Sequence, residues 1–108
     1  MPPTRLTTLA DTPPGSVRRI VVRGEEYAIA RTVEGAVHVF LDVCPHGHCS
    51  LGAGGAIRNG ALVCPCHGSA FDLTTGAVLS PPARFPLTVY PVRIEGDEVW
   101  LAGPPTAS

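Results

Sequence analysis

Two short stretches near the middle of the chain, Cys44-Pro45-His46-Gly47-His48-Cys49 and Cys64-Pro65-Cys66-His67-Gly68-Ser69, carry most of the information in this sequence. They contain all four cysteines of the 108 residues and three of the four histidines. Each holds a Cys and a His at a chelating separation, Cys44-x-His46 in one and Cys64-x-x-His67 in the other. Because two such loops can close around one metal centre, the pattern predicts a shared metal site.

Three other interpretations of these cysteines are weaker. A zinc site fits poorly, because zinc ribbons favour Cys-x₂₋₄-Cys in both halves and Cys64-x-Cys66 is too tight to chelate one ion. A pair of structural disulfides leaves two histidines at fixed spacing unexplained and suits a secreted chain. A catalytic Cys–His pair is disfavoured, because the doubled pattern indicates ligation and no oxyanion hole is recognisable.

The pattern closely resembles the Rieske iron–sulfur family, whose hallmark is Cys-x-His, a spacer of similar length, and then Cys-x-x-His. The resemblance extends to residues 9–15 (LADTPPG), which look like the start of soluble Rieske-type ferredoxins. It continues after the second stretch through Thr75-Gly76 and the proline loop at residues 81–83. It therefore covers most of the chain.

The resemblance implies a Rieske-type [2Fe–2S] cluster as the cofactor. By analogy with the family, Cys44 and Cys64 would bind one iron, and His46 and His67 the other. Two thiolates, two sulfides and two ferric ions sum to zero charge, whereas four thiolates would leave a negative charge. Adding one electron therefore costs less than in an all-cysteine cluster, and the implied activity is one-electron transfer.

The resemblance also implies roles for four further residues. Cys49 and Cys66 occupy the positions where many respiratory-type Rieske proteins hold a disulfide across the two loops, so we expect that disulfide here. Ser69 matches the family serine whose hydroxyl reaches a bridging sulfide, which would raise the potential. Phe71 stands where high-potential members carry Tyr, and Phe cannot donate a hydrogen bond. We therefore expect Ser69 and Phe71 to tune the cluster, with a potential below that of those members.

The remaining sequence predicts one all-β domain. Its 12 Gly and 12 Pro are spread throughout, which disfavours long helices. Glycine-containing turns at residues 23–24, 34–35 and 95–97 predict hairpins, and Pro91 within an apolar run indicates a sheet edge or a bulge. Apolar alternation predicts short strands at residues 5–9, 17–23, 26–31, 36–41, 61–63, 70–73, 77–79, 87–94 and 98–102. The resemblance makes this a Rieske-type antiparallel sandwich or barrel over residues 1–108, with a cluster-binding subdomain at about 41–79.

Charge and hydropathy exclude several classes of partner. The net charge is -1, with eight Arg and no Lys, so there is no basic stripe for nucleic acid and no polybasic membrane patch. No apolar run approaches the roughly 20 residues of a membrane span, and the N-terminus does not resemble a signal peptide. We therefore expect a cytoplasmic monomer without a membrane anchor.

The function implied is that of a soluble Rieske-type ferredoxin, an electron-transfer component rather than an enzyme, between a flavin-dependent reductase and a terminal oxygenase. Gly47, where quinol-oxidising relatives carry a bulky apolar residue, favours this interpretation. The predicted docking patch contains small or apolar loop residues, Pro45, Gly47, Pro65 and Pro82. Two alternatives stay open: the small subunit of an assimilatory nitrite reductase, and the soluble head of a quinol or arsenite oxidase Rieske subunit.

Overall fold

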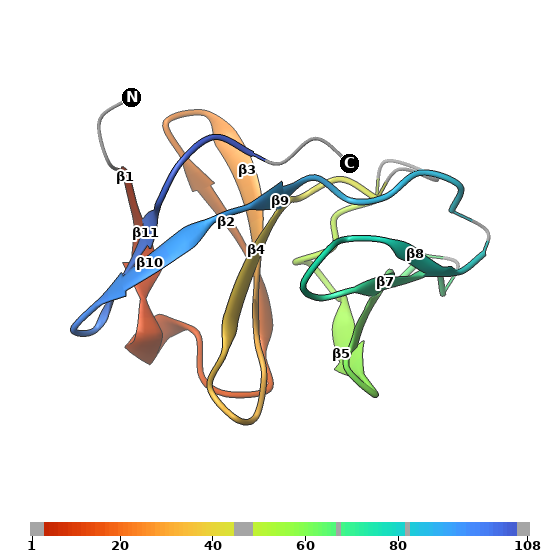
Figure 1. Cartoon of the computed structure of the whole chain (residues 1–108), viewed down its shortest axis with the longest axis horizontal. Helices are drawn as coiled ribbons and strands as arrows, with labels where there is room; N and C mark the ends of the chain where they lie inside the picture. The colour runs from red at the N-terminus through yellow and green to blue at the C-terminus, as the bar shows by residue number, and fades with distance from the viewer. Residues whose placement is uncertain (1–3, 45–48, 67, 82, 106–108) are drawn as a thin grey trace.

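The computed structural model describes residues 4–44, 49–66, 68–81 and 83–105, which form three antiparallel sheets (Figure 1). The first has the order β1 (Thr4–Thr8), β11 (Glu98–Leu101) and β10 (Val92–Glu95). The second has the order β2 (Val17–Val22), β3 (Glu25–Arg31), β4 (Val37–Leu41) and β9 (Val89–Tyr90). The third has the order β5 (Ala56–Arg58), β6 (Ala61–Val63), β7 (Ala70–Asp72) and β8 (Val78–Ser80). A 3₁₀ turn, η1 (Leu9–Asp11), follows β1, and the predicted all-β class is confirmed.

Tight turns connect the strands where the sequence predicts them. Between β2 and β3, Arg23 and Gly24 have φ angles of 53° and 81°. Positive φ at both central residues is the requirement of a two-residue turn whose twist matches that of the flanking strands. The other two predicted hairpins, β3–β4 and β10–β11, form as well.

One strand lies where the sequence analysis expects none. The glycine-rich residues 51–60 contain β5, which pairs with β6 through a turn at Asn59 and Gly60. These two residues have φ angles of 50° and 77°, the same turn geometry as Arg23 and Gly24. Three residues among glycines are too few to show an alternating pattern, so only the pairing with β6 defines this strand.

The predicted strand at residues 87–94 is divided at Pro91. β9 pairs with β4 in the second sheet, whereas β10 pairs with β11 in the first. Proline has no N–H for a ladder, so the chain passes from one sheet to the other at this residue. The carbonyl of Pro91 accepts a hydrogen bond of 2.9 Å from Ala102 N–H.

The central strands of the second sheet, β3 and β4, are buried on both faces, and their successive residues point to different cores. One core contains Tyr27, Ile29 and Val39 with Leu6 and Val99. The other joins Ala28, Ala30 and Phe40 to residues of the third sheet and its loops, namely Cys44, Leu51, Leu62, Cys64, Phe71, Leu73, Ala83 and Leu87. We call this second group the inter-sheet core. It attaches the β5–β8 sheet to the rest of the molecule.

Some expectations stay predictions. In the part of the chain described here, no helix is long and apolar enough to cross a membrane. The cytoplasmic location, the monomeric state and the boundaries of the cluster-binding subdomain at about residues 41 and 79 remain expectations from the sequence.

Candidate functional site

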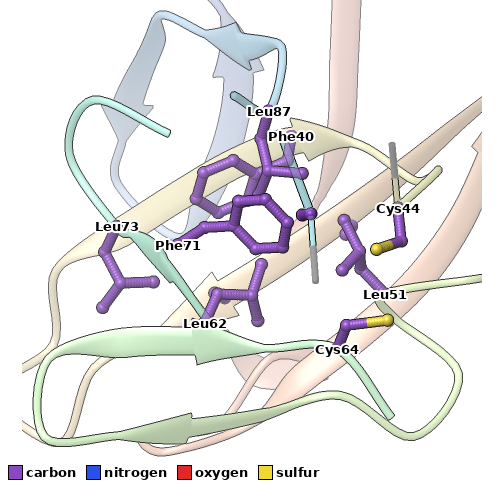
Figure 2. Close-up of a cluster of buried hydrophobic side chains, with 11 residues drawn as sticks. Phe40, Cys44, Leu51, Leu62, Cys64, Phe71, Leu73 and Leu87 are labelled. Atoms are coloured by element: carbon purple, nitrogen blue, oxygen red, sulfur yellow. The ribbon is translucent and has the colours of Figure 1, made fainter. Parts of the chain in front are cut away.

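Two of the predicted ligands, Cys44 and Cys64, lie in the inter-sheet core. Their exposed fractions are 1% and 3%. Figure 2 shows both sulfur atoms at the same end of this core, beside Leu51. Residues from two separate loops are thus brought together by packing, with their thiols shielded from water.

The other two predicted ligands, His46 and His67, lie outside the described residues, as do Pro45, Gly47 and Pro82. Within the described ranges, no group of three or more His, Cys, Asp or Glu side chains could hold a metal ion. That result covers only half of the predicted ligand set, so the full set stays a prediction.

The two cysteine loops close in the same way. The backbone N–H of Cys44 donates to the carbonyl of Cys49 at 2.9 Å, and that of Cys64 donates to the carbonyl of Ser69 at 2.8 Å. The second loop is tightened further, because Gly68 N–H donates to the carbonyl of Cys64 at 3.2 Å. Each predicted ligand cysteine therefore begins a loop that its own N–H closes five residues later.

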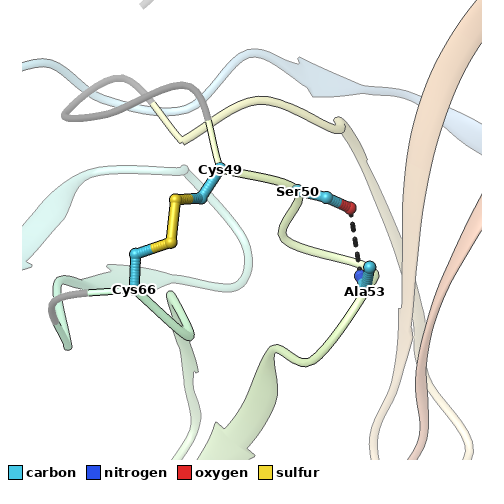
Figure 3. Close-up of a disulfide and its surroundings, with 4 residues drawn as sticks. All are labelled: Cys49, Ser50, Ala53 and Cys66. Atoms are coloured by element: carbon cyan, nitrogen blue, oxygen red, sulfur yellow. Dashed lines mark hydrogen bonds between the residues drawn. A yellow bond between two sulfur atoms is a disulfide. The ribbon is translucent and has the colours of Figure 1, made fainter.

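A disulfide joins the two loops, as predicted, between Cys49 and Cys66 (Figure 3). The Cα atoms are 6.5 Å apart. Cys49 is half-buried against the inter-sheet core, whereas Cys66 is exposed. Cys44 and Cys64 stay outside this bond.

This division of the cysteines narrows the donor sets that the sequence leaves open. Two sulfurs are consumed by the disulfide, so a four-cysteine zinc site cannot form, and the second structural disulfide is not made. Two buried thiols, those of Cys44 and Cys64, stay outside the disulfide, so any metal bound by both would need further donors of another kind. The residues present therefore fit a mixed Cys and His cluster.

Ser69 and Phe71, the predicted tuning residues, are both fully buried. The hydroxyl oxygen of Ser69 accepts a hydrogen bond of 3.0 Å from Ala83 N–H, which leaves the hydroxyl proton available for another acceptor. Phe71 lies opposite Leu62 on β6, and Figure 2 shows its ring within the inter-sheet core. Their positions are compatible with tuning, which stays a prediction.

The sequence analysis missed Asp42, which follows β4. Its side chain has 0% exposure and forms an ion pair with Arg19, with 3.2 Å between Oδ2 and Nε. The carboxylate also accepts hydrogen bonds from Ser50 Oγ at 2.6 Å and Gly52 N–H at 2.7 Å. A single acidic residue after a strand carries no sequence signal of such burial.

The sequence analysis also missed two exposed apolar side chains, Leu79 and Phe85, which are 56% and 67% exposed. They lie before and after the proline loop, and Pro65 of the predicted patch is exposed as well. A hollow of about 410 Å³ lies beside Cys64, with Arg58 as its charged lining residue. Isolated apolar residues in a proline-rich segment could not be distinguished from core residues before the fold was known.

Two ionisable side chains, His38 on β4 and Asp72 on β7, have shifted pKa values. Burial lowers the pKa of His38 on β4, and the negative charge of Asp72 opposes that shift. The backbone N–H groups of Thr75 and Thr74, which both donate to Asp72 Oδ1, lower the pKa of this carboxyl. The neutral imidazole and the ionised carboxylate are therefore the favoured forms.

Comparison with known proteins identifies the family. The model of the Rieske [2Fe-2S] domain matches residues 4–91. The chain belongs to the Rieske [2Fe-2S] domain family. Among curated Rieske relatives, the biphenyl dioxygenase ferredoxin subunit of Pseudomonas sp. (strain KKS102) is 36% identical over 96 residues, which are 89% of this chain and 87% of that protein. The 3-phenylpropionate/cinnamic acid dioxygenase ferredoxin subunit of Escherichia coli (strain K12) is 34% identical over 93 residues, 86% of each chain.

Solved structures agree with this assignment. A chain in the complex of reduced oxygenase and oxidized ferredoxin of carbazole 1,9a-dioxygenase matches this Rieske protein with a TM-score of 0.85 and 31% identity, covering 98% of this chain and 97% of that one. The putative NADH-dependent nitrite reductase small subunit from Mycobacterium tuberculosis has a TM-score of 0.78 but only 23% identity, covering 99% of this chain and 96% of its own. The latter likeness shows a common fold alone. The resemblance to Rieske-type ferredoxins is confirmed.

Proposed function

We propose that this Rieske protein is a one-electron carrier between a flavin-dependent reductase and a terminal oxygenase, with a [2Fe–2S] cluster held by Cys44, Cys64, His46 and His67. The observation that carries the proposal is the match to dioxygenase ferredoxin subunits, which spans most of both chains. The two buried thiols outside the disulfide support the ligand assignment.

When bound, a cluster of this type accepts and releases one electron at a time. The protein's part is to keep the ligands in place in both charge states. Cys44 and Cys64 are held by the inter-sheet core, and the disulfide links the end of the first loop to Cys66 within the second. Ser69 can donate its hydroxyl proton toward a cluster sulfur, whereas Phe71 adds an apolar ring without a donor. With a cluster bound, these residues would keep the loops in one arrangement while the electron is taken up and released.

Docking to the partner would use the exposed apolar residues beside the loops. Ala83 N–H binds Ser69 Oγ, so the proline loop and the second cysteine loop are tied together. Leu79 and Phe85 flank this loop and are more than half exposed. A small apolar surface suits a transient complex, in which rapid release matters more than affinity.

The carrier role is tested by anaerobic reductive titration followed by electron transfer. We expect one electron per chain, taken up reversibly, and rapid reduction of the oxidised oxygenase component of biphenyl dioxygenase in stopped-flow measurements. Uptake that is irreversible, or that differs from one electron per chain, would overturn the proposal.

The docking surface is tested with Phe85→Ser. We expect a slower second-order rate of oxygenase reduction with an unchanged midpoint potential. Val33→Ser is the matched control, because Val33 is 75% exposed but lies in the β3–β4 turn. Equal rates for the two variants would argue against the assigned surface.

A further inference from the structure

We propose that Asp42 is a positioning residue that fixes the first cysteine loop, and through the disulfide the second, to the edge of the β2–β3–β4–β9 sheet. This inference rests on the proposed function, because the positioned loops are those that would hold the cluster. It assigns a role to a buried charge that the ligand pattern does not include.

The contacts of the Asp42 side chain join three segments of the chain, its own and two others. Arg19 lies on β2, while Ser50 and Gly52 follow the first cysteine loop. Asp42 itself lies just before that loop, after β4. The carboxylate therefore joins the start of the loop to its end, and both of them to β2. A fully buried carboxylate with an ion pair and two hydrogen bonds is well compensated, and removing it would leave several groups without their partner.

The segment after the loop lies directly against β2. A Cβ atom added to Gly52 would overlap the backbone nitrogen of Arg19, so only glycine allows this approach. Ser50 orders this segment internally, because its hydroxyl oxygen also accepts a hydrogen bond of 3.1 Å from Ala53 N–H (Figure 3). The carboxylate and the glycine thus hold one short segment against the backbone of β2.

Arg19 is itself held in place by a second, exposed carboxylate. Its guanidinium pairs with Glu26 of β3 as well as with Asp42. The backbone N–H of Asp42 also donates to the carbonyl of Glu26 at 3.1 Å. Neighbouring strands therefore orient the charged partner, which gives the carboxylate a fixed position.

From Asp42 the constraint reaches both predicted ligand cysteines by short connections. Cys44 is two residues further along the chain, and its N–H is bonded to the carbonyl of Cys49, next to Ser50. Cys49 is bonded to Cys66, which lies two residues after Cys64. A change at Asp42 should therefore alter the loops more than it alters the remainder of the fold.

Hydrogen exchange of the full-length protein tests this inference, measured by mass spectrometry on Asp42→Ala and Asp42→Asn. In Asp42→Ala we expect peptides covering residues 49–55 to exchange at least about tenfold faster, because Gly52 N–H loses a charge-assisted hydrogen bond. Asp42→Asn keeps one oxygen acceptor but loses the ion pair, so an intermediate rate is expected. Val99→Ala is the control, because Val99 lies in the other core and its loss lowers stability without touching the loop.

Two spectroscopic readouts separate positioning from general stability. In Asp42→Ala we expect the visible absorbance to bleach about tenfold faster with an iron chelator, and the g-values of the reduced-state EPR signal to shift. Val99→Ala should change neither. Loop exchange and EPR values in Asp42→Ala that match those of Val99→Ala would overturn the positioning role. A wild-type chain that binds no cluster would instead refute the proposed function, while the exchange data would still decide whether Asp42 holds the loop.

Discussion

The hydroxyl oxygen of Ser69 accepts a hydrogen bond from the backbone N–H of Ala83, with 3.0 Å between the two atoms and both residues buried. This contact ties the proline loop to the second cysteine loop. It also orients the hydroxyl, since one lone pair of the oxygen is occupied and the proton must point elsewhere. A serine predicted from the family pattern to tune the cluster thus has a second, structural partner.

Ser69→Ala should lower the midpoint potential and the stability together. The cluster would lose a hydrogen bond that favours its reduced form, and Ala83 N–H would be left buried without its acceptor, at a cost of about 1–3 kcal/mol. Protein-film voltammetry and urea denaturation measure the two effects. Ser16→Ala, which removes a hydroxyl bonded to Pro13 O far from the loops, should leave the potential unchanged. An unaltered potential in Ser69→Ala would refute the tuning role.

Phe71→Tyr should raise the midpoint potential by an amount on the order of tens of millivolts, because the added hydroxyl can donate to a ligand sulfur. Phe40→Tyr makes the same chemical change in the same core, on β4, and should not raise the potential. Voltammetry of both variants measures the difference. The hypothesis fails if Phe71→Tyr shows no rise, or a fall.

Removal of the Cys49–Cys66 disulfide should lower the free energy of unfolding by about 3 kcal/mol, the value expected for a closed loop of this length. The double variant Cys49→Ser/Cys66→Ser, compared with wild type in urea, measures this loss. Wild-type protein treated with a thiol reductant should then behave like the double variant. Equal stability of all three samples would show that the disulfide adds no constraint to the two loops.

His38 should make the protein less stable in mild acid. Burial lowers the pKa of His38 in the folded state, so the unfolded chain binds its proton more readily. Stability is therefore lost as the pH falls below about 6.5, the ordinary pKa of histidine. Between about pH 7.5 and 5.5, the free energy of unfolding should fall less in His38→Gln than in wild type. The other three histidines are present in both proteins, so their contribution drops out of the comparison. Parallel pH profiles would contradict the assignment.

Local chemistry explains what the sequence predicts correctly. The Arg23-Gly24 turn can be predicted because the turn needs a positive φ angle, and the glycine within it adopts one readily. The spacing of Cys44 and Cys64 from their histidines is also a local feature, but the ligand set that it indicates stays a prediction. The Cys49–Cys66 pairing needed more, because only the family resemblance selected it among the possible connectivities.

Features that depend on contacts with other segments could not be predicted. β5 exists because β6 pairs with it, and its three residues have no pattern of their own. The burial of Asp42 depends on Arg19 and Gly52, which lie on other segments. The exposure of Phe85 depends on where the proline loop crosses the surface. In each case the decisive interaction is made with another segment of the chain and leaves no pattern in the residues themselves.

The most direct test of the central claim is the EPR spectrum of the purified, chemically reduced protein, recorded with iron and sulfide analysis. We predict two iron and two sulfide ions per chain, and a signal with the low average g-value of mixed nitrogen and sulfur ligation. That signal should be lost in Cys44→Ser and His67→Ala. A colourless protein, a zinc-containing one, or the spectrum of an all-cysteine cluster would contradict the account.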